Sequence, residues 1–401
     1  MSRFPTLLAA VGLSHVADQM ALAALPLCAV LALGAGPGLT GALVAAQGAA
    51  WLLVSLPAGV VVDRGSKRRL IVGAQVAAAL ACALAALAAS QGAGPLLGFA
   101  SFVGTGGTVV LALAALALVP HLVPAGELPK ANARLELARA GAALAAPVLA
   151  GFLAERANPA LGFAVAALAA ALAALVAARL PEGVAQAAPA RPPVTRAIRE
   201  GADFALRHPL LRGIVLCAVF WNFAFFALLA VAVPFALERI GLDAARTGLM
   251  QGGYGVGLIL GALVAPGLLA RVAPRSILIA GPVLSTLAAA LLWTAPRGGG
   301  FAAGAAAYFL IGFGPMLWLI CQTSIRQLVT PAALLGRVAA LIQVAIYGVR
   351  PLGALAGGTL AAVAGLDAAV TLVIVAFALS ALVPLVSALG QLRSMPAASP
   401  A

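Results

Sequence analysis

The chain alternates long apolar runs with short polar breaks along almost its whole length. A helix that crosses the hydrocarbon core of a bilayer needs about 20 predominantly apolar residues. The apolar runs predict twelve membrane-spanning helices, at residues 6–33, 39–62, 70–90, 96–120, 132–154, 159–179, 211–237, 246–270, 275–295, 301–325, 335–363 and 367–390. An even number of crossings places both chain ends on the same side of a membrane.

Composition supports an integral membrane protein, because 64% of the residues are hydrophobic and 9% are charged. Soluble domains carry about 25% charged residues. The net charge of +13 would also suit a nucleic-acid-binding protein. Most Lys and Arg residues, however, fall in alternate loops between the apolar runs, which is the distribution that marks cytoplasmic loops. The charge therefore predicts that both termini are cytoplasmic, and we expect no nucleic-acid partner.

Two classes of catalytic or binding motif are absent from the sequence. The two lysines, Lys67 and Lys130, do not follow a glycine, so the chain has no Gly-x-x-x-x-Gly-Lys-[Ser/Thr] loop for ATP. The four cysteines stand singly inside apolar runs and the three histidines are scattered, without the spacing of a metal site or of a His-Glu-x-x-His protease motif. We expect no enzyme activity, no cofactor and no metal.

The sequence also repeats itself at half length, since Leu70–Ala74 recurs as Leu278–Pro282. The longest connection between apolar runs ends in a basic stretch rich in helix formers, Val194–His208. This stretch suits either a cationic helix on the cytoplasmic surface or a solvated linker. The predicted segments are an N-terminal six-helix half (1–179), a cytoplasmic linker (180–210), a C-terminal six-helix half (211–390) and a cytoplasmic tail (391–401).

A charged loop is predicted between the second and third apolar runs, over residues 59–69. Five of its residues follow the pattern Gly-x-x-x-Asp-Arg-x-Gly-[Arg/Lys]-[Arg/Lys], with Ser66 at the second glycine: Gly59, Asp63, Arg64, Lys67 and Arg68. The loop resembles the signature loop of the major facilitator superfamily. The resemblance implies an all-α membrane protein of twelve helices in two pseudo-symmetric six-helix halves, with a substrate site between them. The loop then acts as a gating latch or, taken alone, as an orientation signal.

Four further blocks, in order along the chain, are similar to one branch of that superfamily. They are Asp18–Pro26, Leu122–Asn132, Arg199–Pro209 and Arg326–Gly353. This branch comprises proton-coupled drug antiporters, among them macrolide efflux proteins and the enterobactin exporter. The resemblance implies proton-coupled efflux of amphipathic small molecules, of the drug, macrolide or siderophore type, by alternating access. The alternatives are a lysophospholipid or lipid flippase, an uncoupled carrier of the same fold, and a non-transporting sensor or scaffold.

Polar residues in the first span share one helical face, because His15, Asp18 and Gln19 are three and four positions apart. Ionisable groups inside a bilayer are costly and mark pathways or proton relays by default, with structural ion pairs as the alternative. A carboxyl group shielded from water can load and release a proton, so Asp18 is the predicted coupling residue. His15 is a candidate relay or a packing residue, and Gln19 a candidate substrate contact.

Three more charged residues lie inside spans, Glu136, Arg139 and Arg350. The spacing of Glu136 and Arg139 predicts an ion pair on one face of the fifth span, either structural or part of a gate. Arg350 stands alone in the eleventh span. It either binds an anionic substrate or donates to carbonyl groups freed by Pro351.

Prolines and small residues accompany these charges. Pro147 and Gly151 in the fifth span resemble a Gly-Pro-x-x-Gly-Gly segment of related antiporters, and Pro351 and Gly353 carry a similar pattern in the eleventh. Small residues allow close helix approach, so we interpret these four as hinge or packing positions. Aromatic and amide side chains suit an amphipathic ligand, and the predicted cavity wall consists of Trp221, Asn222, Phe225, Gln251, Tyr254, Trp318 and Gln322.

The expected partners are an amphipathic small molecule, protons and the lipid bilayer. We expect a monomer, because both halves that a transport pathway requires are on one chain. A high alanine content with two lysines suggests a GC-rich bacterial genome, and hence a multi-pass protein of the bacterial inner (plasma) membrane.

Overall fold

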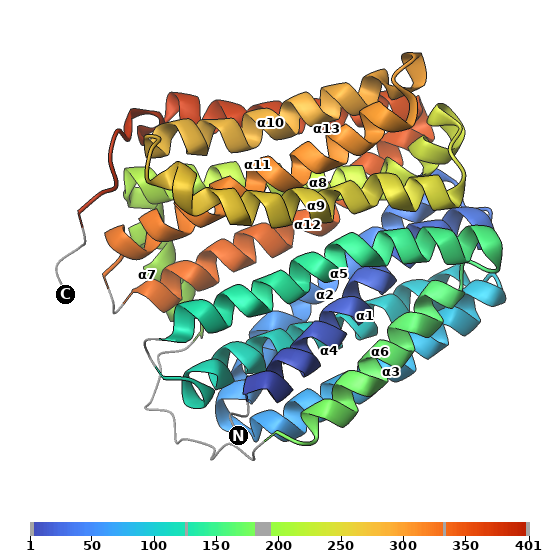
Figure 1. Cartoon of the computed structure of the whole chain (residues 1–401), viewed down its shortest axis with the longest axis horizontal. Helices are drawn as coiled ribbons and strands as arrows, with labels where there is room; N and C mark the ends of the chain where they lie inside the picture. The colour runs from blue at the N-terminus through green and yellow to red at the C-terminus, as the bar shows by residue number, and fades with distance from the viewer. Residues whose placement is uncertain (1–3, 125–126, 181–193, 332–333, 398–401) are drawn as a thin grey trace.

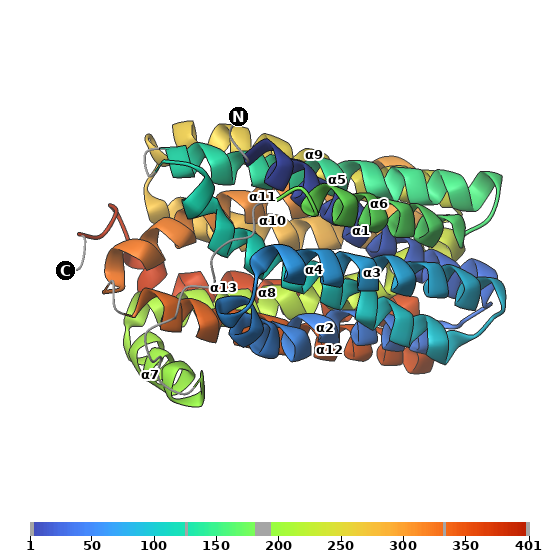
Figure 2. The same ribbon diagram turned by 90° about the horizontal axis from the view of Figure 1, so that it is seen from below.

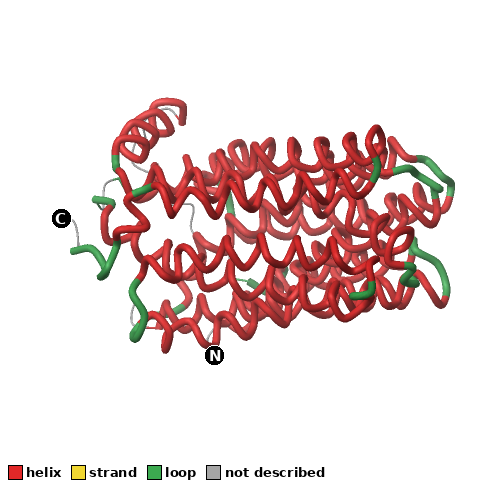
Figure 3. Tube along the Cα trace, turned by 90° about the horizontal axis from the view of Figure 1, so that it is seen from above, coloured by secondary structure: helices red, strands yellow, loops and turns green. Residues whose placement is uncertain are grey.

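The structure, a computed structural model of the chain, describes residues 4–124, 127–180, 194–331 and 334–397. Nearly all of these residues are helical, and no strand occurs among them (Figure 3). The helices are α1 (Phe4–Leu27), α2 (Pro37–Arg64), α3 (Lys67–Ser90), α4 (Gly94–Leu122), α5 (Leu128–Arg156), α6 (Leu161–Ala177), α7 (Val194–Arg207), α8 (Pro209–Pro234), α9 (Ala244–Leu269), α10 (Pro274–Thr294), α11 (Gly300–Val329), α12 (Leu335–Ala364) and α13 (Leu366–Val386).

Eleven of the described helices are long and apolar enough to cross a membrane. The predicted span at 159–179 forms α6, which is apolar but 17 residues long, or about 25 Å at the rise of an α-helix. Large apolar side chains such as Leu116, Leu263 and Val363 are exposed on the outside of the bundle, as expected where lipid rather than water is the surrounding solvent. The all-α membrane fold predicted from the apolar runs is confirmed.

The helices form two bundles that lie side by side (Figure 1). Helices α1 to α6 pack mainly on one another and make the N-half, and α8 to α13 do the same and make the C-half. Two helix pairs make most of the contact between the halves, α5 with α9 and α2 with α12, the second pair being adjacent in Figure 2. Both ends of the described chain lie at the end of the bundle where α7 lies. We call this the termini end and the opposite one the far end.

The buried apolar side chains divide differently at the two ends. Toward the far end, α1 to α6 and α8 to α13 all contribute to one shared core, which contains for example Ala24, Ala224 and Ala354. Toward the termini end, the N-half has its own core around Ile71, and the C-half has a separate one around Leu278. The halves are therefore packed together at the far end and have distinct interiors at the termini end.

Glycines make the far-end seam tight. A Cβ on Gly248 of α9 would lie 2.2 Å from the carbonyl oxygen of Pro147 in α5, and one on Gly151 would lie 2.4 Å from that of Ala244. In the other pair of helices, a Cβ on Gly41 would lie 2.7 Å from Gly358 Cα. Only glycine allows backbones to approach this closely, so these positions fix both helix crossings between the halves.

A polar contact across the halves adds to the far-end seam. The backbone N–H of Ala244, at the first turn of α9, donates to the Glu155 carboxylate near the end of α5, at 3.0 Å. The next free N–H of that turn, on Arg246, donates to the Asp243 carboxylate at 2.6 Å. Carboxylates at a helix N-terminus satisfy otherwise unpaired amides and oppose the helix dipole. The Glu155 carboxylate belongs to the N-half, so it links α5 to the first turn of α9 in the C-half.

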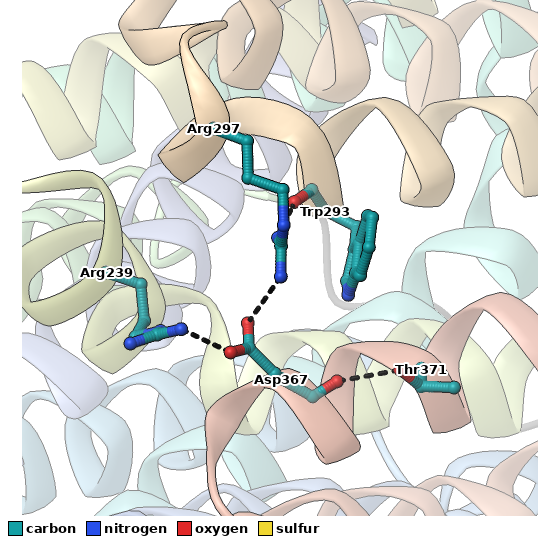
Figure 4. Close-up of polar contacts among 5 residues, drawn as sticks. All are labelled: Arg239, Trp293, Arg297, Asp367 and Thr371. Carbon is teal, nitrogen blue, oxygen red and sulfur yellow. Dashed lines mark hydrogen bonds and ion pairs between the residues drawn. The ribbon is translucent and has the colours of Figure 1, made fainter.

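Within the C-half, a second far-end cluster centres on Asp367 at the start of α13 (Figure 4). Its carboxylate pairs with Arg239 beyond α8 and, at 3.9 Å, with Arg297 beyond α10. Arg297 lies over the Trp293 ring at 3.6 Å and donates to the Trp293 carbonyl, and Thr371 donates to the Asp367 carbonyl at 2.8 Å. Asp367 thus connects the far-end segments that follow α8 and α10 with α13.

The first helix of each half ends in the same irregular way. Pro26 near the end of α1 is followed by a π-helical turn, Cys28–Ala32, and Pro234 at the end of α8 is followed by another, Phe235–Ile240. The two prolines have the same spacing as Leu70 and Leu278. A proline removes one N–H from the helix ladder, and a π-turn is a recognised local adjustment of such a ladder. The half-length repeat in the sequence is therefore also present in backbone geometry.

Helix α7 begins where the predicted basic stretch begins, and residues 181–193 of the linker lie outside the described residues. In Figure 2 α7 projects away from the body of the bundle at the termini end. Glu200 pairs with Arg337 near the start of α12, and a Cβ on Gly201 would lie 2.5 Å from the Arg337 carbonyl oxygen. Helix α7 is thus anchored to α12, and its place on a membrane surface stays a prediction.

Candidate functional site

The main cavity lies between the halves and has a volume of about 210 Å³. Arg139 of α5 is the single lining residue from the N-half, and all the others come from α8 to α12 of the C-half. Its polar and aromatic lining residues are Arg139, Trp221, Asn222, Tyr254, Trp318, Gln322 and Arg350. Except for Phe225 and Gln251, it contains the whole predicted cavity wall.

The cavity sits where the separate cores give way to the shared core. Along α12, Ile342 belongs to the C-half core and Ala354 to the shared core, with Arg350 between them. Along α8, Asn222 lies in the same way between Val215 and Ala224. The polar residues therefore gather at mid-depth, where the two bundles begin to diverge toward the termini end.

Arg350 is held by an amide and three aromatic rings. Its Nε donates to Asn222 Oδ1 at 3.1 Å. Its guanidinium lies 4.8 Å from the Tyr347 ring centroid, 5.0 Å from Phe226 and 5.9 Å from Trp51. Among the described residues no carboxylate lies within ion-pair distance of Arg350. Cation–π contacts stabilise the guanidinium but leave its charge unbalanced.

The charge of Arg139 is balanced by a carboxylate on the same helix. Its Nε pairs with Glu136 Oε2 at 2.8 Å, one turn away on α5, as the spacing of the two residues predicts. Whether the pair gates the pathway stays a prediction. Arg139 lines the cavity from the N-half and Arg350 lines it from the C-half, so the lining carries two guanidinium groups.

The opposite wall is aromatic and only partly satisfied in its hydrogen bonds. Trp221 stacks on Phe225 at 5.0 Å, and its indole N–H donates to Ser285 Oγ at 3.0 Å. Trp318 Nε1 and Gln322 Oε1 are buried and have no hydrogen-bond partner. Since buried polar groups are normally paired, these two line the cavity as a donor and an acceptor available to a ligand.

A second, smaller cavity of about 50 Å³ adjoins the first through Tyr254, which lines both. It contains Gln19 of α1, Phe225 of α8 and Gln251 of α9, together with Pro147. The remaining predicted cavity residues are therefore grouped here, next to the predicted hinge proline.

Asp18 lies on α1 directly before the segment that enters the shared core, which begins at Met20. Its carboxylate accepts from Gln19 at 3.4 Å and lies within electrostatic range of Arg139 and Arg350, without an ion-pair contact to either. His15, one turn earlier, lies within range of Arg139. The charged residues predicted separately in three spans thus lie close enough to influence one another electrostatically.

The predicted signature loop over Gly59–Arg69 is wrong in extent, because α2 continues to Arg64 and α3 begins at Lys67. The break consists of two residues. Gly65 ends α2 with its N–H donating to the Val61 carbonyl, and Ser66 caps α3 by accepting from the Arg69 N–H. Gly65 has an extended backbone, and the Ser66 cap accounts for the start of α3 directly after it.

The structure does not test whether the signature residues act as a gate. Lys67 is buried and Gly59 has open space around its Cα, whereas the side chains of Asp63 and Arg64 lie outside the described part of the chain. Their role as a latch, with that of Arg68, stays a prediction.

The predicted hinge residues stand at close helix contacts. Gly151 and Pro147 form the α5–α9 seam, and Gly353 lies against the backbone of Phe223, 2.2 Å from a Cβ to the Phe223 carbonyl oxygen. Pro351 lies inside α12, which continues on both sides of it. These positions pack helices together, and motion about them stays a prediction.

Sequence reasoning missed Trp51, Tyr347 and Ser285, which hold the cavity residues in place. Tyr347 precedes Arg350 by three positions, so helical spacing alone would have placed it on the same face. Trp51 and Ser285 carry no such signal, because the chain brings them to the site only through the packing of α2 on α12 and of α10 near α8.

The sequence profile of the Major Facilitator Superfamily matches residues 7–354 of the chain. The chain is a member of the major facilitator superfamily. The protein is therefore a transporter with the fold of this superfamily. No protein of curated function matches the chain.

Solved superfamily structures share the fold at low sequence identity. The nucleoside transporter NupG is 14% identical with a TM-score of 0.76, over 96% of this chain and 98% of that one. A D-xylose-proton symporter is 16% identical with a TM-score of 0.74, over 94% and 96%. A POT family transporter in complex with 5-aminolevulinic acid is 14% identical with a TM-score of 0.75, over 96% of both chains. Such identities establish the fold and leave the substrate open.

Proposed function

We propose that this transporter is a proton-coupled exporter of amphipathic small molecules, with Asp18 as the coupling residue. The observation that carries the proposal is the position of Asp18. It lies at the edge of the shared core, within electrostatic range of two arginines that line the cavity between the halves. A carboxylate in this position changes the charge of the network each time it binds or releases a proton.

The cavity supports an amphipathic substrate. Its wall combines stacked aromatic rings with a few convergent polar groups, the usual composition of a small-molecule site. Asp18 itself lines neither cavity, but its neighbour Gln19 lines the smaller one. A non-transporting sensor or scaffold has no need of such cavities, and this favours transport over that alternative.

The transport cycle follows from the two kinds of packing. The halves share a core at the far end and have separate cores at the termini end, so this conformation favours access from the termini end. Rocking of the halves would open the α5–α9 and α2–α12 seams and close the termini end. If both termini are cytoplasmic, as the basic loops predict, the structure is inward-facing, with a single chain in a bacterial plasma membrane carrying the whole pathway.

Export by proton exchange rests on the resemblance of the Asp18–Pro26 and related blocks to drug antiporters. A second candidate is uptake by proton co-transport. One structural relative is by name a proton symporter, and Arg350 has no described carboxylate at ion-pair distance, so protonation of Asp18 leaves its charge available to a substrate. The two candidates share the site and the coupling residue and differ in the direction of proton movement.

Proton movement in proteoliposomes tests the proposal. Vesicles with a lumenal pH-sensitive dye start at equal pH on both sides, and lipophilic cations, macrolides and catecholate siderophores are added outside in turn. An exchanged substrate drives protons out of the lumen, whereas a co-transported one carries them in. Asp18→Asn should abolish both signals, and Glu238→Gln, which changes an exposed carboxylate, should change neither.

Equal proton fluxes in wild type and Asp18→Asn would overturn Asp18 as the coupling residue. If no compound moves protons in either protein while labelled compound or lysolipid still crosses, the chain is an uncoupled carrier or a flippase.

A further inference from the structure

The main cavity carries more positive than negative charge. Arg139 is matched by Glu136, but Arg350 has an amide and three aromatic rings around it and no described carboxylate at ion-pair distance. An unmatched charge inside a membrane protein is costly unless something complements it. The nearest intramembrane acid on α1, Asp18, acts on Arg350 over a longer distance.

We infer that the transported molecule is an organic anion with an aromatic or apolar body, whose acidic group binds Arg350 on the side facing Arg139. The inference deepens the proposed function and rests on it, since it takes the cavity to be the transport site. A guanidinium is suited to this task, because its planar fork of donors matches carboxylate, sulfonate and phosphate oxygens.

The geometry leaves this fork available. Asn222 Oδ1 accepts from Arg350 Nε, and no described residue accepts from the terminal guanidinium nitrogens. Trp221 and Tyr254 line the same cavity, so the body of the ligand meets rings while its acid meets the guanidinium. The buried Trp318 N–H is a further donor without a partner. An organic cation would be repelled by the unmatched charge of Arg350.

Matched ligands that differ in charge alone provide the test. Isothermal titration calorimetry on the full-length protein in nanodiscs compares the acid, the amide and the amine of three scaffolds: naphthalene, indole and an octyl chain. We expect at least one acid to bind 10-fold or more tightly than its amide and its amine. If no acid exceeds both of its partners, the inference is overturned.

Two variants separate ligand binding from structural support. Arg350→Gln should weaken the acid by 10-fold or more and the amide by less than 2-fold. Asn222→Asp places a carboxylate beside Arg350 with almost no change of shape, so it keeps the local contact and gives the guanidinium an internal counter-ion. It should also weaken the acid by 10-fold or more. Arg156→Gln, at the exposed far end of the same helix as Arg139, is the control and should change nothing.

The outcomes distinguish this inference from the proposed function. Transport of amides or amines that is unaffected by Arg350→Gln would overturn the anionic class and leave transport standing. Tight binding of an acid, with no compound crossing proteoliposomes, would support the anion site and overturn transport. Competition with lysophosphatidate identifies the source of the anion: displacement of the bound acid at lower concentration assigns the site to a lipid head group, and failure to displace assigns it to a soluble acid.

Discussion

The two halves have the same architecture and contribute differently to the site. The N-half supplies His15, Asp18 and the Glu136–Arg139 pair, all of which are ionisable, and Arg139 is its single residue that lines the main cavity. The C-half supplies almost the whole wall, including Trp221 and the other aromatic and amide side chains, and Arg350. In the proposed mechanism, proton handling belongs mainly to the N-half and ligand binding mainly to the C-half.

In the proposed mechanism, this asymmetry places the coupling at the interface between the halves. Asp18 and Arg350 come from different halves and lie within electrostatic range of each other, so each event changes the field in which the other occurs. A pseudo-symmetric fold can thus assign different chemistry to equivalent positions and join them at its central interface.

The largest expected effect separates the two roles. Asp18→Asn should reduce substrate-driven proton flux by 100-fold or more while the small molecule still binds, because an amide has no proton to exchange. Stopped-flow dye measurements and calorimetry on the same preparation check the two quantities. Loss of binding together with proton flux would show that Asp18 also holds the ligand, and the division between the halves would fail.

A substitution in the part of the cavity wall that the C-half supplies should weaken ligand binding. Trp221→Ala removes a ring stacked on Phe225 and a hydrogen bond to Ser285, and we expect ligand affinity to fall about 10- to 100-fold, equivalent to about 1.4–2.8 kcal/mol. Equilibrium binding measures this. Trp293→Ala, which changes a tryptophan of the far-end cluster, is the matched control; an equal loss of affinity there would mean that general destabilisation, not the cavity, causes the effect.

Double-mutant cycles on binding sharpen the comparison. Asp18→Asn combined with Trp221→Ala should be additive within about 0.5 kcal/mol if the two side chains act independently. Asp18→Asn combined with Arg350→Gln should deviate by about 1 kcal/mol or more, because their charges interact across the interface. Equal coupling in both pairs would argue against a specific Asp18–Arg350 link.

The smallest effect concerns the far end of the C-half. Asp367→Asn should lower thermal stability in detergent by 1 or 2 °C, because partly exposed ion pairs contribute about 0.2–1 kcal/mol each. The Asp367 side chain is 37% exposed. Ligand affinity should stay unchanged. A marked loss of transport in Asp367→Asn would instead place the cluster of Figure 4 within the moving parts of the cycle.

The sequence predicts the helices well because a bilayer leaves a chain few alternatives to the helix. Each apolar run became a helix, including the short α6. It did not predict the length of the break after Arg64, because local caps at Gly65 and Ser66, and not the charges, decide where these helices end. The π-turns after Pro26 and Pro234 were also unforeseen, since a proline alone does not determine how its helix adjusts.

The candidate site was predicted only in part, because the sequence shows which residues are polar but not which helices pack together. Polar or aromatic residues in an apolar run, such as Asn222 and Gln322, are visible without a structure. The separation of Gln251 into a second cavity and the contact of Trp51 with Arg350 depend on how helices distant in the sequence pack together. The sequence also does not indicate the conformational state, because the same residues line the cavity whichever end of it is open.

The shared core also has an electrical consequence. Helices α1 to α6 and α8 to α13 all contribute apolar side chains to it, many of them alanines, so the packing between the cavity and the far end is mainly apolar. A cell that stores energy as a proton gradient cannot tolerate a conducting path through its membrane. In the proposed mechanism the alanine-rich layer acts as electrical insulation, and the charged residues Asp18 and Arg350 lie at its edge.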